Sequence, residues 1–277
     1  MAEQQDITGT PPPDYPVKLG AMLFTLVDPN PGHEVAYNRW YERDHYYGGV
    51  LLGSGTLAGS RWVATRALKD LRFPADSTVA TPVDRGSYLA LYFIEASMIG
   101  PHFAWASEEV HKLYAAGRGF DERTHAHTAL YTHQGTAYRD DDGVPVELAL
   151  DHRYPGLVSV HVDRADGVKH REFDAWFRSV GAGVLLGPDS PVAMVSSWRP
   201  IIPERGEGEA PMDLGSGPGT PQRSAQVCFV EQDPAAAWDR FREYAAAIDA
   251  SGLATVRLVA PFIPTIVGTD TYTDQLW

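Results

Sequence analysis

The sequence contains two similar segments that differ at one ionisable residue. Residues 38–53 read NRWYERDHYYGGVLLG, and residues 174–187 read DAWFRSVGAGVLLG. When the two are aligned on the tryptophan that both contain, His45 of the first segment corresponds to Gly181 of the second. A repeated scaffold in which only one copy keeps the histidine predicts one chemical site per chain.

The spacing of the repeat divides the chain into two parts of similar length. Trp40 and Trp176 are 136 residues apart in a chain of 277 residues. Each part therefore has the usual size of a domain, roughly 130 residues. We predict a first domain over residues 17–150 and a second over residues 151–277, preceded by a proline-rich, disordered lead-in over residues 1–16.

Both parts are predicted to carry the same order of elements. In the first part the hydrophobic pattern predicts strands at residues 18–27, 57–65, 87–94 and 127–138 and helices at 33–47 and 101–115. In the second part it predicts strands at residues 156–162, 193–199, 224–230 and 255–266 and helices at 169–180 and 234–250. Each part thus reads β-α-β-β-α-β, the ferredoxin-like pattern of the α+β class.

A four-stranded antiparallel sheet with both helices on one face leaves its other face uncovered. In a chain with two such sheets, each sheet can cover the other. We therefore predict that the two repeats form an intramolecular α/β barrel, with the helices outside and a cavity between the sheets. Because one chain closes this barrel, the fold does not require a dimer, although the sequence leaves a homodimer open.

Charge and composition exclude several classes of partner and location. The net charge of −13 argues against binding to nucleic acid or to an anionic membrane surface. No segment approaches the roughly 20 apolar residues that span a bilayer. The single cysteine, Cys228, excludes an internal disulfide and suits a reducing cytoplasm. Motifs for nucleotide binding, for a hydrolase nucleophile and for structural zinc are missing from the sequence, so we expect no organic cofactor.

The first of the two segments resembles a known protein family. Residues 37–45, which read YNRWYERDH, follow a predicted strand and turn. They resemble the first-helix signature of the EthD-like group in the dimeric α/β-barrel superfamily, an aromatic pair followed one turn later by a histidine that corresponds to His45. The signature often continues to a proline, where this chain has Tyr47. Members include cofactor-free monooxygenases, polyketide cyclases, decarboxylases, dehydratases, dehalogenating and heme-using enzymes and proteins with no known activity, so fold membership does not select the reaction.

His45 is the leading catalytic candidate. Histidine titrates near neutral pH and can accept or donate a proton at modest cost. His45 lies one turn beyond Tyr41, so the two side chains are expected on one helix face. The alternative is that His45 caps the helix, because Gly48 and Gly49 are expected to end it there.

Further polar and aromatic residues are expected to line the cavity between the sheets. His161 lies within a predicted strand and is the second catalytic candidate, although a buried core histidine explains it equally well. An aromatic cavity would suit a planar, mostly apolar ligand, and ordinary core packing is the alternative for each aromatic residue. The predicted substrate-binding residues are Tyr41, Trp62, Tyr88, Tyr92, His127 and Tyr131.

The segment His125-Ala126-His127 raises the question of a metal site. In an extended strand both imidazoles would lie on one face, where His133 or His161 could join them. No carboxylate or third histidine has a diagnostic spacing, and we therefore predict no metal.

These observations lead to three alternative functions. We predict a cofactor-independent enzyme that performs acid/base chemistry, namely dehydration, cyclisation or decarboxylation, on a small hydrophobic or aromatic carbonyl metabolite. His45 would be the acid/base, and a cavity tyrosine or His161 would orient the developing enolate. The first alternative is a cofactor-free or heme-assisted monooxygenase, and the second is a non-catalytic protein that binds a small molecule.

Overall fold

The computed structural model describes residues 16–202 and 210–277, which follow the predicted order of elements. The first unit contains β1 (Leu19–Pro29), α1 (Glu34–Trp40), β2 (Thr56–Val63), α2 (Arg66–Lys69), β3 (Tyr88–Glu95), α3 (Ile99–Ala115) and β4 (Arg123–Tyr138). The second unit contains β5 (Gly156–Arg164), α4 (His170–Trp176), α5 (Ala182–Leu185), β6 (Val192–Pro200), β7 (Arg223–Val230), α6 (Trp238–Ser251) and β8 (Ala254–Pro264). The predicted disordered lead-in lies outside the described residues except for Pro16.

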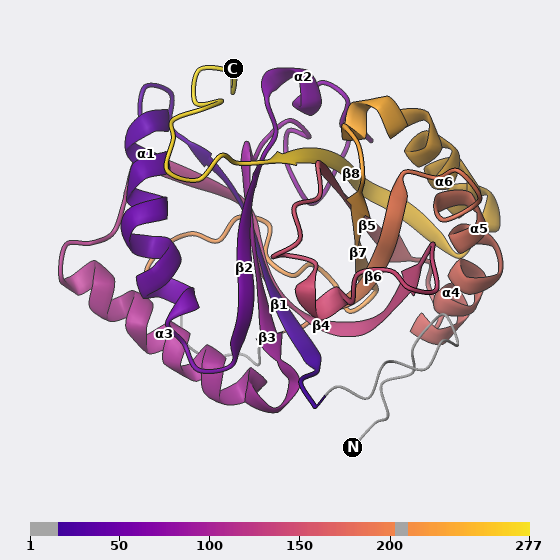
Figure 1. Cartoon of the computed structure of the whole chain (residues 1–277), viewed down its shortest axis with the longest axis horizontal. Helices are drawn as coiled ribbons and strands as arrows, with labels where there is room; N and C mark the ends of the chain where they lie inside the picture. The colour runs from indigo at the N-terminus through magenta and orange to yellow at the C-terminus, as the bar shows by residue number, and fades with distance from the viewer. Residues whose placement is uncertain (1–15, 203–209) are drawn as a thin grey trace.

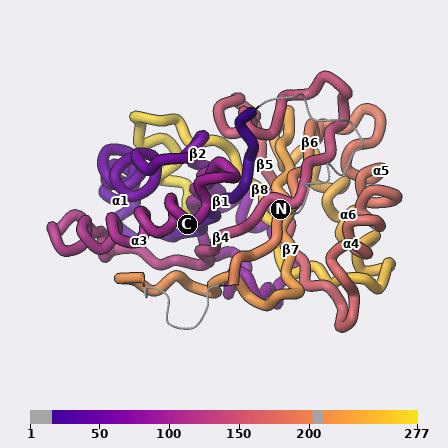
Figure 2. The backbone as a smooth tube through the Cα atoms, turned by 90° about the horizontal axis from the view of Figure 1, so that it is seen from below, coloured from indigo at the N-terminus to yellow at the C-terminus, as the bar shows by residue number. Residues whose placement is uncertain are grey.

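The eight strands form one closed antiparallel barrel. The strand order around the barrel is β1-β3-β2-β8-β5-β7-β6-β4. Within each unit this is the order of a ferredoxin-like sheet, and the units join where β2 pairs with β8 and β4 pairs with β6. Helices α1 and α3 cover one side of the barrel, and α4, α5 and α6 cover the opposite side (Figures 1 and 2). The structure therefore confirms the predicted fold class, an intramolecular barrel of two ferredoxin-like units.

Side chains from both sheets line the barrel interior and pack into one core cluster. Phe24 of β1 points inward and is fully buried, as are its inward-facing neighbours along the strand. Trp62 of β2 donates its indole N–H to Ser60 Oγ at 2.7 Å. Trp198 of β6 makes the same contact with Ser196 Oγ at 2.9 Å. Both units thus contain a Ser-x-Trp pair with the same hydrogen bond.

The first helix does not end at Gly48 and Gly49 as predicted. After α1 it continues through two π-helical turns, η1 (Tyr41–His45) and η2 (Tyr47–Leu51). Neither glycine has the positive φ that a left-handed helix cap requires. His45 therefore lies inside the helix and does not cap it. Single π turns within α-helices often occur at functional sites.

The C-terminal tail, residues 265–277, crosses from the second unit to the first and packs along α1 (Figure 1). The backbone N–H of Gly268 donates to Glu42 Oε2 at 2.9 Å. The Asn38 side-chain amide donates to the carbonyl of Thr269 at 2.8 Å. Leu276 is fully buried against aromatic residues of the first unit. The tail therefore holds in place the helix that continues to His45.

Candidate functional site

The structure separates the predicted site residues into two groups. The residues that point into the barrel are Trp62, His127, Tyr131 and His161. The residues that lie on the outer face of the first sheet, between β-strands and helices, are Tyr41, His45, Tyr88 and Tyr92. His45 and His161 are thus on opposite faces of the sheet and do not meet in one cavity. The expectation that Tyr41, Tyr88 and Tyr92 line the space between the sheets is corrected. Strand alternation directs Tyr88 and Tyr92 of β3 outward, and Tyr41 belongs to the helix that packs on that outer face.

His45 is held between aromatic side chains and a glycine of its own helix. Its ring stacks on Trp40, with ring centroids 4.6 Å apart and planes 15° apart, and its edge meets Tyr41 at 5.4 Å. A Cβ atom added to Gly49 would lie 3.0 Å from Cε1 of His45. In the part of the chain that the structure describes, no group forms a hydrogen bond with this imidazole. Its ring nitrogens are therefore available to a ligand.

Burial and positive charge keep His45 neutral. Burial, the largest cause, together with the charge of Arg123 and an electrostatic effect of His125, lowers the pKa of His45 to about 3, against a smaller opposing effect of Asp44. Burial and Arg123 likewise lower the pKa of His125 to about 3. At neutral pH the site therefore presents two neutral imidazoles near one fixed cation.

Arg123 supplies that cation and fixes the tautomer of His125. Its guanidinium carbon lies 4.6 Å from the centre of the Trp40 ring. It donates from Nε to His125 Nε2 at 3.1 Å and from Nη1 to the carbonyl of Phe120 at 2.7 Å. Because arginine only donates, Nε2 of His125 must accept, so its Nδ1 carries the proton and donates to Thr128 Oγ1 at 2.7 Å. We call Trp40, Tyr41, His45, Arg123 and His125 the His45 cluster.

Tyrosines and a second arginine surround the His45 cluster on the side of β2 and β3. The hydroxyls of Tyr41 and Tyr92 are 2.9 Å apart and share a hydrogen bond. The guanidinium carbon of Arg61 lies 4.6 Å from the Tyr41 ring and 5.0 Å from the Tyr88 ring. Burial raises the pKa of Tyr88 to about 12, which keeps this phenol neutral. Predicted residues Tyr41, Tyr88 and Tyr92 therefore belong to one aromatic layer with His45.

A β-bulge separates His125 from His127. The register between β1 and β4 shifts between Leu26 and Val27, so His125 faces the helices and His127 faces the barrel interior. The prediction that both imidazoles lie on one face of the strand is therefore wrong. Within residues 16–202 and 210–277, no group of three or more His, Cys, Asp or Glu side chains is placed to hold a metal ion.

The strands of the second unit carry apolar residues where the first unit carries this site. The second unit has a corresponding bulge, where the register between β5 and β8 shifts between His161 and Val162. The two units can therefore be superposed residue by residue on their bulges. Counted from them, the positions equivalent to Arg123, His125 and Thr128 are Ala254, Val256 and Val259. At these three positions the first unit therefore carries polar or ionisable side chains and the second unit carries apolar ones.

The helices of the second unit fill the space that His45 occupies in the first. Gly181 ends the equivalent π turn, η5 (Phe177–Gly181). A Cβ atom at Gly181 would lie 2.9 Å from ring atoms of both Phe177 and Tyr244. Tyr244 belongs to α6, which buries five of its residues, whereas α3 buries only His102 and Leu113. Close packing of α6 therefore excludes a histidine from the second copy.

The looser packing of α3 leaves apolar sheet surface partly exposed. Leu23 and Leu130 pair across β1 and β4 on the helix-facing side, and both are partly exposed. Their equivalents in the second unit, Val158 and Pro261, pair in the same way and are buried. Leu23 packs in the same cluster as Trp40. An apolar surface next to the His45 cluster thus remains reachable from outside the protein.

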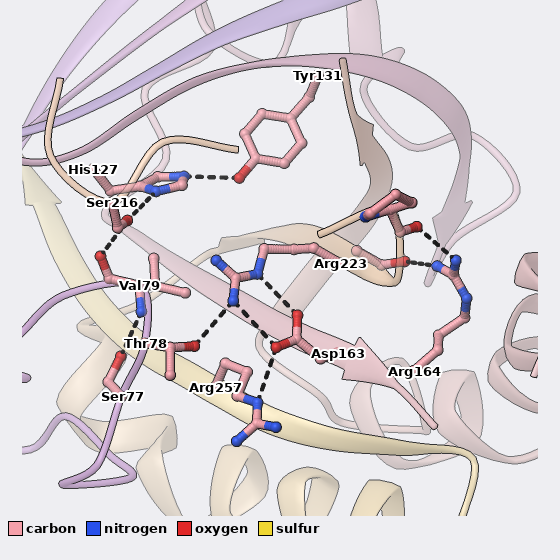
Figure 3. A network of polar contacts seen from close by, with 12 residues as sticks. Ser77, Thr78, Val79, His127, Tyr131, Asp163, Arg164, Ser216, Arg223 and Arg257 are labelled. Carbon is pink, nitrogen blue, oxygen red and sulfur yellow. Dashed lines mark hydrogen bonds and ion pairs between the residues drawn. The ribbon is translucent and has the colours of Figure 1, made fainter. Parts of the chain in front are cut away.

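The barrel-facing residues form a separate polar network (Figure 3). Ser216 Oγ donates to the carbonyl of Val79 at 2.8 Å, so it must accept from His127 Nδ1 at 2.8 Å. The other ring nitrogen of His127 then accepts from the Tyr131 hydroxyl at 2.8 Å. His127 and Tyr131 are fully buried, and their polar atoms are satisfied within the network. This network joins two loops to the wall of the barrel.

Sequence reasoning missed Arg123, Thr128 and Arg61 as members of the site. Arg123 stands at the first residue of β4, and its direction depends on the bulge that follows it. A bulge has no firm sequence signal of its own, so the face on which these residues lie could not be derived. One signal was available: the second repeat has apolar residues at the positions equivalent to Arg123 and Thr128.

The comparisons with known proteins identify the fold and no closer relationship. No protein-family model matches this sequence, and no curated protein matches it. A solved structure of an anthrone oxidase-like protein is similar with a TM-score of 0.53 and 10% identity, over 92% of this chain and 98% of that one. A candidate chlorite dismutase gives a TM-score of 0.51 and 11% identity, over 94% and 100% of the two chains. The encapsulated DyP-type peroxidase from Mycobacterium smegmatis is similar with a TM-score of 0.50 and 13% identity, over 96% of each chain.

These similarities show that the chain has the fold of dimeric α/β-barrel proteins, here closed within one polypeptide. At such low sequence identity, fold does not determine activity. Across the described residues, every helix is too short or too polar to span a membrane.

Proposed function

We propose that this protein is an enzyme that uses His45 as a general acid/base on a small hydrophobic or aromatic carbonyl compound, without an organic cofactor. The observation that carries the proposal is the difference between the two units. The His45 cluster is polar and ionisable, whereas its structural equivalent is apolar and closely packed. Burying ionisable groups costs free energy, and such groups with perturbed pKa values gather at functional sites. Their retention in one copy supports a chemical role.

The proposed first step removes a proton from the carbon next to the substrate carbonyl. Neutral His45 accepts this proton, and the C–H electron pair moves toward the carbonyl oxygen to give an enolate. The positive charge of Arg123 stabilises the negative charge that develops. Trp40 and the partly exposed pair Leu23 and Leu130 provide the apolar surface on which an aromatic ring would rest.

The low pKa of His45 determines when it can hold the proton. In the empty site the imidazolium is unfavourable, because burial and Arg123 both disfavour it. An enolate beside the ring supplies the opposite charge and raises the pKa of His45. In dehydration the proton then passes to a leaving hydroxyl, and in cyclisation it passes to the alkoxide oxygen that forms when the enolate attacks a second carbonyl. Decarboxylation reaches the enolate differently: His45 takes the carboxyl proton, loss of carbon dioxide leaves the enolate, and His45 returns the proton to carbon.

Hydrogen–deuterium exchange at carbon tests this step without knowledge of the natural substrate. We expect the protein to catalyse α-proton exchange of aromatic ketones such as 2-tetralone in D2O, followed by proton NMR. His45→Ala should lose this catalysis, and His111→Ala, on the exposed face of α3, should keep it. Undiminished exchange in His45→Ala, or none by the wild type across a panel of aromatic ketones, contradicts the proposal.

A second candidate is oxygen chemistry, either cofactor-free or heme-assisted. It is favoured by similar structures that are described as an anthrone oxidase-like protein and a DyP-type peroxidase. A substrate deprotonated by His45 is electron-rich and suited to react with oxygen. His45, a neutral imidazole without a partner in the described residues, is also the side chain that would bind heme iron. Oxygen uptake with anthrone, or a Soret absorbance band in the purified protein, would favour this candidate.

The remaining alternative is a binding protein without catalysis. The barrel interior supports it, because buried side chains line the space expected between the sheets and include polar atoms of His161 and Ser159 that have no hydrogen-bonding partner in the described residues. The exchange measurement also decides this alternative. Membership of the EthD-like group is likewise a proposal, supported by the signature at residues 37–45 and by the place of His45 within its helix.

A further inference from the structure

The second unit leaves polar atoms without partners inside the barrel. Both ring nitrogens of His161 and the hydroxyl oxygen of Ser159 are buried and lack a hydrogen-bonding partner in the described structure. His161 is completely inaccessible to solvent and Ser159 is 1% exposed. They stand two residues apart on β5, so both side chains point to the same face. Three unsatisfied polar atoms therefore share one region of the interior.

Leaving such atoms unsatisfied is costly, and the fold does not require them. Buried polar groups in proteins nearly always have a hydrogen-bonding partner. Counted from the bulges, Phe24 and Leu26 occupy the equivalent positions of the first unit and are fully buried. Apolar side chains thus fit this layer of the barrel, so packing alone does not account for His161 and Ser159.

The surroundings combine small side chains with a flat aromatic wall. Ala225 is the neighbour of His161 on β7, and Ala260 is the neighbour of Ser159 on β8. The ring of Phe24 meets His161 edge to face at a centroid distance of 5.2 Å. Eight-stranded barrels have interiors that are either filled by side chains or able to hold one small ligand. The small side chains of Ala225 and Ala260 favour an interior that can hold a ligand next to His161.

The neighbouring network leaves His161 as the group that faces a ligand. Both nitrogens of His127 are already used, by Ser216 and Tyr131. The ring centroids of His127 and Tyr131 lie 5.4 Å and 6.2 Å from that of His161. The Tyr131 hydroxyl donates to His127, so its oxygen still has accepting capacity. The available groups are therefore one imidazole, one serine hydroxyl and one phenol oxygen.

The electrostatics indicate an uncharged ligand. Burial, together with smaller electrostatic effects of His127 and Arg223, holds the pKa of His161 well below its usual range, so the imidazole is neutral. Arg223 itself forms a bidentate pair with Asp163, at 2.9 Å and 3.2 Å (Figure 3). Asp163 also accepts from Arg257 Nε at 3.0 Å, so both guanidinium groups are bound to a carboxylate. An ion that entered this region would lose its hydration.

From this geometry we propose that the barrel interior beside His161 and Ser159 binds one small uncharged molecule that carries a hydroxyl or carbonyl oxygen. The site is distinct from the His45 cluster, because the sheet lies between them. Val79 and Ala80, in the loop between α2 and β3, are part of the core, and Val79 accepts from Ser216 at this end. Exchange of the molecule therefore requires these loops to separate and should be slow.

The test combines native mass spectrometry with a matched pair of probes. The purified wild type should carry a mass excess of one small organic molecule, and the double variant His161→Leu, Ser159→Ala should lose it. At pH 7, phenol, which is uncharged, should raise the melting temperature of ligand-stripped wild type, whereas benzoate, which is an anion, should not. Neither probe should stabilise the double variant, and His45→Ala should respond as the wild type does.

Each contrary outcome overturns the inference. A wild type without a mass excess that is also unaffected by phenol means that water or nothing occupies the interior. A double variant that is more stable than the wild type shows that the polar atoms are merely unsatisfied. If the double variant fails to fold, Ser159→Ala alone should weaken the response to phenol several-fold, and an unchanged response contradicts the assignment. Because the readouts are binding and mass, failure here is distinguishable from failure of the chemistry at His45.

Discussion

His45 and Trp40 stack face to face although they are five residues apart, with ring centroids 4.6 Å apart. In a regular α-helix, side chains three and four residues apart are neighbours. The π turn from Tyr41 to His45 adds a residue to the helical turn and brings His45 back over Trp40. The geometry of the site is therefore a direct consequence of this local departure from α-helical winding.

Gly49 leaves space for the His45 ring in this stack because it has no side chain. Gly183 of the second unit, where an added side chain would lie in open space, provides a control. We expect Gly49→Ala to push the His45 ring from Trp40, because the new Cβ would lie 3.0 Å from Cε1. Turnover should fall on the order of tenfold to a hundredfold, the usual effect of a misplaced catalytic group. Gly183→Ala, at the first residue of the GVLLG stretch that both segments contain, meets nothing within 4 Å and should raise the free energy of unfolding by about 0.5–1 kcal/mol. Equal activity in the two variants would contradict the role of the stack.

Arg123 should control the protonation of both histidines of the cluster. Its charge lowers the pKa of His45 and of His125, so Arg123→Met should move both pKa values upward, as NMR titration of the imidazole resonances can show. The developing enolate would lose its cation, and kcat should fall on the order of a hundredfold. Arg139→Met, which removes the ion pairs with Asp140 and Glu231 directly after β4, is the control. Unmoved histidine resonances in Arg123→Met would rule out the electrostatic coupling.

The contact between the C-terminal tail and the helix should be important for stability. Asn38 accepts from Arg61 Nη1 at 2.8 Å and donates to the carbonyl of Thr269 at 2.8 Å. We expect Asn38→Ala to cost about 1.5–3 kcal/mol in urea unfolding, because buried Arg61 loses a charged hydrogen bond. Arg39→Ala removes an exposed ion pair with Asp270 and should cost at most about 1 kcal/mol. The tail should also become more sensitive to proteolysis in Asn38→Ala only.

The architecture could be predicted from the sequence because it depends on pattern and repetition. The pattern of apolar residues predicts the strands. The uncovered face of each predicted sheet must be buried, and the other sheet of the chain can bury it. The position of His45 in the site could not be predicted in the same way. Gly48 and Gly49 have the composition of a helix end, yet in the structure Gly49 makes room for a ring from the preceding turn.

The face on which strand residues lie was predictable only where the strand is regular. His161 lies before the β5–β8 bulge and points into the barrel, whereas its neighbour Val160 belongs to the helix-facing cluster. His125 and His127 were assigned to one face, and the bulge in β4 placed them on two. A bulge depends on strand pairing between residues about 100 positions apart, which a local pattern does not record.

The buried histidines should make the protein unstable in mild acid, and His127 is the clearest case. It is fully buried, and burial, with a smaller effect of Arg223, lowers its pKa to about 3. In the unfolded chain its pKa is about 6.5, so between these values the unfolded state binds the proton and the folded state does not. Stability is therefore complete above about pH 6.5 and is lost as the pH falls toward 3, by up to about 1.4 kcal/mol per pH unit for each such histidine. His45 and His125 act in the same direction. Urea unfolding at pH 7.5, 6.5 and 5.5 should show this slope, and His127→Gln should have a shallower slope even if it is less stable at pH 7.5. Equal stability at pH 7.5 and 5.5 would mean that the imidazoles are protonated as easily in the folded protein as in the unfolded chain, and the neutral state required of His45 would lose its basis.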